Sequence, residues 1–263
     1  RIHKTGKIGV LSIHKPDRMF YNSDNAVKFL TLQGARKRLR AKAFTGLTNE
    51  QRVSCLKKLI LVTSPPACGK TFISRQLAGA LKHVVYLDKD TLIPLSKQIF
   101  AVAHQPYDRS SIFFEKYIRD LEYQVILDLA MEALLYDDIV LINAPFTQEI
   151  RDDAYIAALR KELAKKEAEL VVIWVDTDPE VCHQRMIDRA SDRDIWKLNH
   201  WDEYILGVNF EPPVNLRLEG QPDSLLIFHN SSEEEFAASM KEIVSQLEAS
   251  VKKGLRPNTP IRL

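Results

Sequence analysis

Cysteine is scarce in this chain of 263 residues, which contains only Cys55, Cys68 and Cys182. Three scattered thiols are too few for a disulfide framework, and no two of them have the close spacing of a zinc site. No apolar run approaches the roughly 20 residues that cross a bilayer, and the first residues contain no apolar signal-peptide core. These absences predict a cytoplasmic protein with reduced thiols and no membrane partner.

Internal repeats and low-complexity tracts are also missing, and overall charge is nearly balanced at +2. The balance is uneven, because the first fifty residues contain eleven Lys and Arg against three acids. A basic stretch at residues 34–42 could contact nucleic acid or a phosphorylated partner. We favour a solvated helix face, since no stacking aromatics are interleaved with these charges.

Beyond residue 50, short apolar runs alternate with longer amphipathic segments, a rhythm typical of a parallel sheet with crossover helices. The expected strands are 59–63, 84–87, 139–143, 170–176 and 225–229, and the expected helices are 71–82, 111–136, 150–167, 179–190 and 233–253. The pattern predicts an α/β, doubly wound, three-layer domain with ligands beyond the carboxyl ends of the strands. We place this domain at residues 58–254, after an N-terminal extension of unassigned fold (1–57) and before a C-terminal tail (255–263).

A glycine is absent where a phosphate-binding loop usually begins. Residues 63–71 read TSPPACGKT and end like the pattern G-x-x-x-x-G-K-[ST], but Ser64 occupies the first glycine position. In such loops the lysine reaches the β- and γ-phosphates and the final hydroxyl binds magnesium. The loop lies between an apolar strand and an amphipathic helix, whose N-terminus attracts anions. We therefore predict a nucleotide site that contains Lys70 and Thr71.

Two prolines stiffen the same loop. Pro65 and Pro66 have no N–H group to offer a phosphate, so the cradle should consist mainly of the amides from Ala67 to Thr71. Serine at position 64 is tolerated if its backbone angles are ordinary. Cys68 is interpreted as a small filler of the loop, although a helix N-terminus would lower its pKa.

Two carboxylates, Asp88 and Asp90, follow the second expected strand in the sequence YLDKDT. If the strand continued, both would project from one face at the edge where a γ-phosphate would lie. One could accept the proton of an attacking hydroxyl while the other oriented the substrate or a magnesium-bound water. Aspartates that cap a turn before a helix are the alternative.

Arginines recur every four residues at 185, 189 and 193, after the fourth expected strand. A helix would present them along one side, where they could neutralise the charge of a transferred phosphoryl group. Alternatively, Asp188 and Asp192 could hold them in surface ion pairs. Asp178 and Pro179 are expected to begin this helix, with Asp178 as its cap.

Taken together, the loop, the D-x-D sequence and the arginine-bearing segment resemble the P-loop kinases of small hydroxyl-bearing substrates, over approximately residues 58–250. That group includes the zeta-toxin-like sugar-nucleotide kinases, chloramphenicol phosphotransferase, polynucleotide 5′-kinases, and gluconate and shikimate kinases. The resemblance implies parallel strands in the order 2-3-1-4-5, ATP as the donor, and Mg²⁺.

The same resemblance assigns roles to residues of this chain. Ala67, Cys68, Gly69 and Lys70 would contact the phosphates, Thr71 and Asp88 the metal, and Arg185 the adenine. Asp88 or Asp90 would be the general base, and Arg189 and Arg193 would face the transferred phosphate. These roles make the expected activity the transfer of the γ-phosphate to a hydroxyl of a small molecule or nucleotide sugar.

One departure from the pattern follows the third expected strand, where the sequence reads LINAPF. Asn143 could position a water or a substrate hydroxyl but cannot hold magnesium as a carboxylate would. The metal should therefore depend on Thr71 and on the Asp88 and Asp90 pair. Ala144, Pro145 and Phe146 could line an acceptor pocket or simply pack the strand against a helix.

Two other functions remain open at this point. An ATP-hydrolysing or ATP-gated regulatory protein is one, although no apolar run ends in Asp-Glu at the third strand. A polynucleotide 5′-kinase is the other, with the basic segment tracking the backbone of a nucleic acid.

Overall fold

In the computed structural model, five parallel strands form one sheet in the order β2-β3-β1-β4-β5. The structure describes residues 57–191, 194–216 and 224–252, all of which belong to the part of the chain from residue 49 onward. The strands are β1 (Lys57–Thr63), β2 (Val84–Asp88), β3 (Ile139–Asn143), β4 (Ala168–Asp176) and β5 (Leu225–His229). Strand order and direction confirm the predicted fold class, while the predicted N-terminal extension lies outside the described residues.

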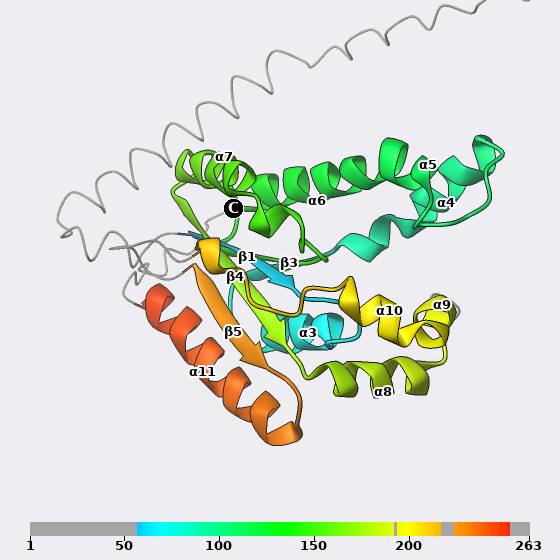
Figure 1. Ribbon diagram of the computed structural model, residues 1–263. Helices are drawn as coiled ribbons and strands as arrows, with labels where there is room; N and C mark the ends of the chain where they lie inside the picture. The colour runs from blue at the N-terminus through cyan, green and yellow to red at the C-terminus, as the bar shows by residue number, and fades with distance from the viewer. Residues whose placement is uncertain (1–56, 192–193, 217–223, 253–263) are drawn as a thin grey trace, which may run out of the picture. The chain divides into compact units, whose positions relative to one another are not determined.

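Helices cover both faces of the sheet, as Figure 1 shows. They are α3 (Lys70–Ala80), α4 (Ile93–Val102), α5 (Ile112–Phe114), α6 (Asp120–Ala133), α7 (Asp153–Ala164), α8 (Pro179–Arg189), α9 (Ile195–Asn199), α10 (Trp201–Leu206) and α11 (Glu233–Lys252). Short 3-10 helices are η1 (Lys89–Leu92), η3 (Glu149–Arg151) and η5 (Val214–Leu216), and a π-helical turn, η2 (Glu115–Arg119), joins α5 to α6. None of the helices in the described ranges is long and apolar enough to cross a membrane.

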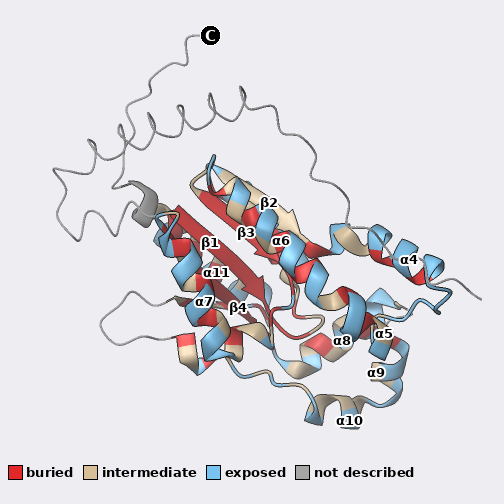
Figure 2. Cartoon of the chain, turned by 90° about the horizontal axis from the view of Figure 1, so that it is seen from above, coloured by how far each residue is buried: buried red, intermediate tan, exposed pale blue. Residues whose placement is uncertain are grey.

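The central strand β1 is buried along its whole length, as expected for a strand covered by helices on both faces. Figure 2 shows this burial in β1, β3 and β4, whereas the edge strand β2 is only partly buried. Two apolar clusters lie on opposite faces of the sheet. One joins α6 and α7 to residues such as Leu59 and Trp174, and the other joins α3, α8 and α11 to residues such as Ile60 and Val62.

The strand predictions agree closely with these bounds, but the segment from η1 to α6 was only partly predicted. The expected helix at 111–136 is present as α5, the π-helical turn and α6, and Ser111 caps it through its hydroxyl group. Helices α4, α9 and α10 were not predicted. The expected start of α8 is confirmed, because Pro179 begins the helix and the Asp178 side chain accepts a hydrogen bond from the Glu180 amide.

Strand register brings separate parts of the sequence to one edge of the sheet. Asp88, the last residue of β2, pairs with Asn143, the last residue of β3, and Asn143 pairs with Val62 of β1. Neighbouring strands lie about 4.8 Å apart. The end of β2 is therefore two strands away from the point where β1 enters the phosphate-binding loop.

Candidate functional site

The backbone of the loop between β1 and α3 is left-handed at Gly69, a conformation that favours glycine. Gly69 adopts φ 90°, and Ala67 has φ 66°, so two residues of the loop are left-handed. Ser64 is not among the described residues with positive φ, which confirms that serine is accommodated there by ordinary angles. The amides of Ala67, Cys68 and Gly69 donate no hydrogen bond within the described ranges. Unpaired amides at a helix N-terminus are suited to bind a phosphate.

Lys70 is the first residue of α3 and folds back over the loop. Its Nζ lies 3.4 Å from the Ser64 carbonyl oxygen, the Ser64 hydroxyl and the Pro65 carbonyl oxygen. Ser64 itself is buried and donates its hydroxyl to the Pro65 carbonyl at 2.8 Å. The ammonium group is thus held at the start of the loop by three oxygen atoms, one of which is the Pro65 carbonyl oxygen.

A layer of side chains supports the loop from behind. The Cys68 carbonyl accepts hydrogen bonds from the Asn230 side-chain amide (2.8 Å) and the Thr177 hydroxyl (3.2 Å). The Asn230 backbone N–H in turn donates to the Asp176 carbonyl at 2.9 Å. The sequence did not predict this support by Asn230. Its one signal was its position directly after β5, beside the end of β4.

Cys68 and Cys182 are both fully buried, and their sulfur atoms lie 3.4 Å apart. The largest effect on the pKa of Cys68 is the hydrogen bond from Cys182, which lowers it. Burial raises this pKa, and the attraction of Lys70 lowers it, so the net change is downward. Since neither thiol is exposed, the geometry agrees with the interpretation of Cys68 as a filler of the loop.

Alanine in place of Gly69 should damage this loop specifically. A Cβ at this position would lie 2.7 Å from the Asn230 Nδ2 atom, and φ 90° is strained for alanine. We expect Gly69→Ala to lower the free energy of unfolding by about 1–3 kcal/mol and to weaken ATP binding at least tenfold, by about 1.4 kcal/mol. Chemical denaturation and calorimetric titration with ATP measure the two effects.

Gly79→Ala is the matched control, because a Cβ there meets no atom within 4 Å and the residue lies inside α3. Alanine favours a helix by up to about 1 kcal/mol over glycine, so this variant should be at least as stable as the wild type and bind ATP normally. Equal ATP affinity in both variants would contradict the proposed loop geometry.

Thr71, the predicted magnesium ligand, contacts Asn143 directly. The Asn143 Nδ2 atom donates a hydrogen bond to the Thr71 hydroxyl at 3.1 Å, while its Oδ1 atom is buried and has no partner in the described chain. Magnesium prefers oxygen ligands and usually keeps several waters, with one or two protein groups and phosphates completing its shell. The Thr71 hydroxyl and the unpaired amide oxygen fit that requirement, and within the described ranges no three His, Cys, Asp or Glu gather at a metal site.

The D-x-D sequence has a different geometry from the one predicted. Strand β2 ends at Asp88, and Asp90 lies in the 3-10 helix η1, so the expectation that both acids project from one strand face is wrong. Asp88 caps this helix, because its Oδ1 accepts the Asp90 N–H at 3.0 Å and its Oδ2 accepts the Tyr86 hydroxyl at 2.9 Å. Asp88 therefore caps a turn, as the alternative interpretation expected. Its carboxylate is held by these two hydrogen bonds, and its backbone is the register neighbour of Asn143.

Lys89 separates the two acids and is buried in an ion network that the sequence did not predict. Its Nζ donates to Glu122 Oε2 at 2.8 Å. Arg109 donates two hydrogen bonds to the same carboxylate, at 2.8 and 2.6 Å, and the Ser96 hydroxyl donates a further one. Burial by itself would raise the pKa of Glu122, but these donors outweigh burial and lower that pKa to about 2.

The low pKa of Glu122 predicts an acid-sensitive contribution to stability. A folded-state pKa of about 2, against an ordinary value of 4.5, means that the ionised group stabilises the fold above about pH 5 and loses this effect as pH falls toward 2. The shift corresponds to roughly 3 kcal/mol. The free energy of unfolding, measured with urea from pH 7 to pH 2.5, should be higher for the wild type than for Glu122→Gln, and this difference should narrow below pH 4.5. A difference independent of pH would contradict this assignment.

The three arginines are not aligned along one helix. Helix α8 ends at Arg189, where Ala190 adopts φ 43°, and Arg193 lies outside the described residues. Arg185 donates from Nη2 to the Asn230 carbonyl at 2.9 Å, while its buried Nη1 has no partner in the described chain and would lie 3.7 Å from a Cβ at Gly69. Arg185 is therefore directed at the phosphate-binding loop.

Arg189 forms an ion pair with a buried acid. Its Nε donates to Asp194 Oδ2 at 2.5 Å, and Lys197 donates to the other oxygen at 3.1 Å. Burial would raise the pKa of Asp194, but these two cations outweigh it and lower the pKa. Asp188 accepts a hydrogen bond from Gln184, and no arginine among the described residues pairs with it.

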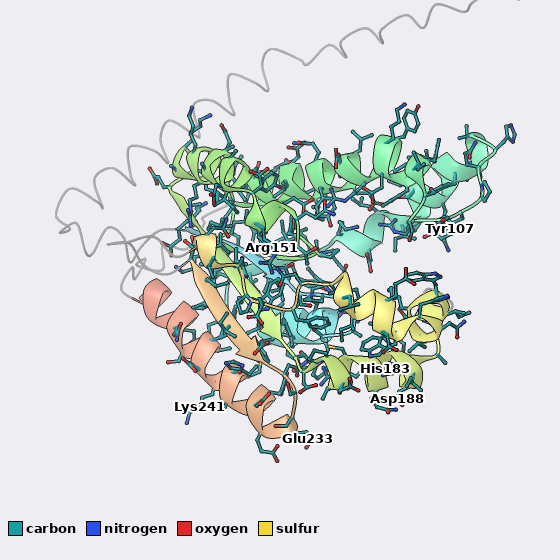
Figure 3. The ribbon with its side chains drawn as sticks, viewed as in Figure 1. Tyr107, Arg151, His183, Asp188, Glu233 and Lys241 are labelled. Atoms are coloured by element: carbon teal, nitrogen blue, oxygen red, sulfur yellow. The ribbon has the colours of Figure 1, made fainter. Side chains whose placement is uncertain are left out.

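Aromatic side chains connect α8 to α10. His183 stacks on Trp201 with ring centroids 4.0 Å apart and planes 7° from parallel. Figure 3 shows His183 between the two helices. Trp196 stacks on His200 in the neighbouring segment. Both stacks are contacts within the protein.

Comparison with known proteins gives one family. The profile described as AAA domain matches residues 59–207, more than half of the chain. Among solved structures, a "putative kinase" from Chloroflexus aurantiacus j-10-fl is 20% identical with a TM-score of 0.52, and the match covers 76% of this chain and 100% of that one. At this identity the similarity supports a shared fold.

Two further structures match with TM-scores of 0.42. A gluconokinase from Sinorhizobium meliloti 1021 is 14% identical, over 74% of this chain and 97% of that one. A shikimate kinase from Bacteroides thetaiotaomicron is 12% identical, over 74% of this chain and 99% of that one. No protein with curated annotation matches significantly.

Proposed function

The chain belongs to the AAA-domain family, and we propose that it is an ATP-dependent phosphotransferase that moves the γ-phosphate to a hydroxyl of a small molecule or nucleotide sugar. One observation carries this proposal. Asp88 is the register neighbour of Asn143, and Asn143 contacts the Thr71 hydroxyl, the group that binds magnesium in loops of this pattern. A fixed carboxylate is thus one strand from Asn143 and two strands from the loop that contains Thr71, the residues suited to the terminal phosphate and its metal.

In this proposal the loop holds the nucleotide. The amides of Ala67, Cys68 and Gly69 bind phosphate oxygens, and Lys70 neutralises the β- and γ-phosphates. Bound Mg²⁺ would supply charge neutralisation at the phosphates, and Thr71, Asn143 and Asp88 are the residues that would hold it.

Asp88 acts as the general base for the acceptor. Its carboxylate accepts the proton as the acceptor oxygen attacks the γ-phosphorus. The bond between the γ-phosphorus and the bridging oxygen breaks, and ADP leaves with that oxygen on its β-phosphate. Asp90, which is exposed on η1, orients the acceptor hydroxyl. Holding both reactants in place supplies most of the expected acceleration, since phosphoryl transfer needs little covalent help from the protein.

The arginines complete the charge balance. Arg185 lies nearest to the loop and is proposed to contact the nucleotide, at the adenine or at the phosphates beside Gly69. Arg189 would have to exchange its ion pair with Asp194 for a phosphate oxygen when substrate binds. Arg193 is proposed for the same role from its sequence position alone.

A screen of phosphoryl acceptors tests this function. The protein is incubated with γ-labelled ATP and Mg²⁺ together with sugars, sugar acids, nucleotide sugars, aminoglycoside and phenicol antibiotics, or single-stranded oligonucleotides. We expect label to move to a small hydroxyl compound, which would also decide whether the protein belongs to the zeta-toxin and chloramphenicol phosphotransferase group. Label on oligonucleotide 5′ ends would replace this proposal with a polynucleotide kinase, and release of phosphate to water alone would favour a hydrolase.

A further inference from the structure

Glu122 is the point at which three separate segments of the chain meet. Lys89 comes from η1, Ser96 from α4, and Arg109 from the connection between α4 and α5. The Glu122 side chain is 5% exposed, and each of its oxygens already accepts two hydrogen bonds. A carboxylate with its acceptor positions filled does not need a ligand to satisfy it, so its role is inside the protein.

The same turn of α6 is also fixed to the end of β3. Tyr123, next to Glu122, donates its hydroxyl to the Pro145 carbonyl at 2.8 Å, and the Lys89 ammonium lies 5.2 Å from the centre of its ring. Pro145 is two residues beyond Asn143. Lys89 is thus held from two sides by neighbouring residues of α6, one of which is bonded to the strand end that contacts Thr71.

A π-helical turn precedes the part of α6 that contains Glu122 and Tyr123. Residues Glu115–Arg119 are wound with an extra residue, which shifts the residues that follow around the helix axis. Glu122 and Tyr123 are both buried. Turns of this kind occur often at functional sites.

The stabilisation by ionised Glu122 is relative to its protonated form and does not make a buried ion pair the most stabilising choice for a core. Removing charges from water is costly, and apolar side chains of the same size often stabilise a core as well or better. Such pairs can instead fix one geometry among several. Here the residue that is fixed, Lys89, lies directly between Asp88 and Asp90.

We propose that Glu122 is a positioning residue for the acid pair: it holds Lys89, and through Lys89 it sets the turn that directs Asp88 and Asp90 toward the acceptor. This proposal rests on the proposed phosphotransferase function. It adds a residue that touches neither nucleotide nor acceptor and that acts through the backbone of η1.

The test compares Glu122→Gln with Glu149→Gln. Glu149 is the matched control, because it forms a similar ion pair with Arg119 at 2.5 Å, is 11% exposed, and has no hydrogen bond or ion pair with η1 within the described residues. Hydrogen exchange of the amides of Lys89–Leu92 is measured in both variants, together with kcat and KM for MgATP with the hydroxyl compound that accepts label in the acceptor screen. Lys89→Met, which keeps the length of the side chain, serves as a second variant if Glu122→Gln does not fold.

We expect Glu122→Gln to speed exchange in η1 at least tenfold and to lower kcat by about tenfold to a hundredfold, with KM for ATP within about twofold of wild type. Glu149→Gln should change neither quantity. Wild-type exchange in η1, or a kcat that falls equally in both variants, would overturn the positioning role. If the wild type transferred label to no acceptor in the screen, the proposed function would fall, while the exchange comparison would still decide whether Glu122 holds the turn.

Discussion

Lys70→Ala is expected to abolish detectable phosphoryl transfer and to remove most of the affinity for ATP. The Lys70 ammonium lies within 3.4 Å of three oxygen atoms at the start of the loop, so it is already placed over the site that the phosphates would enter. Hydrogen bonds to a charged group contribute about 1.5–3 kcal/mol each, so ATP binding should weaken by roughly tenfold to a hundredfold or more. Turnover should fall by at least about a thousandfold, since the lysine also balances charge that develops in the transition state.

Calorimetric titration with MgATP and transfer of labelled γ-phosphate measure the two losses. Lys82→Ala is the control, because Lys82 is an exposed lysine just past the C-terminal end of α3. The two variants should have the same circular dichroism spectrum and melting temperature. Normal ATP binding by folded Lys70→Ala protein would mean that the nucleotide does not occupy this loop.

Asp88→Asn should separate binding from chemistry. Asparagine has nearly the same shape and can still accept the Asp90 N–H through its oxygen, so η1 should keep its cap. The amide cannot accept a proton, however, and the loss of a general base costs about a hundredfold to ten-thousandfold in rate. ATP affinity should remain within about twofold of wild type.

Asp90→Asn should have the smaller effect, since Asp90 is exposed and is proposed to orient the acceptor only. Asp128→Asn, which alters an exposed acid of α6 bonded to Gln124, controls for the change in surface charge. Stopped-assay measurement of labelled product over a range of ATP concentrations gives kcat and KM for each variant. Wild-type rates in both Asp88→Asn and Asp90→Asn would exclude the acid pair from catalysis.

The sheet could be predicted from the sequence because its signals are local and strong. Runs such as LILV at residues 59–62 and IVLIN at 139–143 have no alternative to burial, and the loop after the first run has a fixed spacing. Asp178 and Pro179 likewise indicated the start of α8, because aspartate is common as a helix cap and proline at the first helical position. Strand order followed from the resemblance to P-loop kinases and not from the strands themselves.

The parts that could not be predicted depend on contacts between distant residues. Lys89 and Glu122 are 33 positions apart, and Asn230 supports Cys68 across 162 positions, so neither pairing leaves a spacing to read. The geometry of the D-x-D sequence was predicted wrongly because a side-chain contact changes the path of the backbone. Alternation along a strand predicts a shared face, but the Asp88 side chain captures the Asp90 amide and turns the chain into a 3-10 helix.

The arrangement of the acid and the phosphate is most directly tested by a crystal structure with a non-hydrolysable ATP analogue and Mg²⁺. With the β- and γ-phosphates on the amides of Ala67–Gly69, we expect an Asp88 carboxylate oxygen about 5–6 Å from the γ-phosphorus, which leaves room for one acceptor hydroxyl between them. A separation greater than about 10 Å, with Asp88 still capping η1 and directed into solvent, would contradict phosphotransferase chemistry at this site.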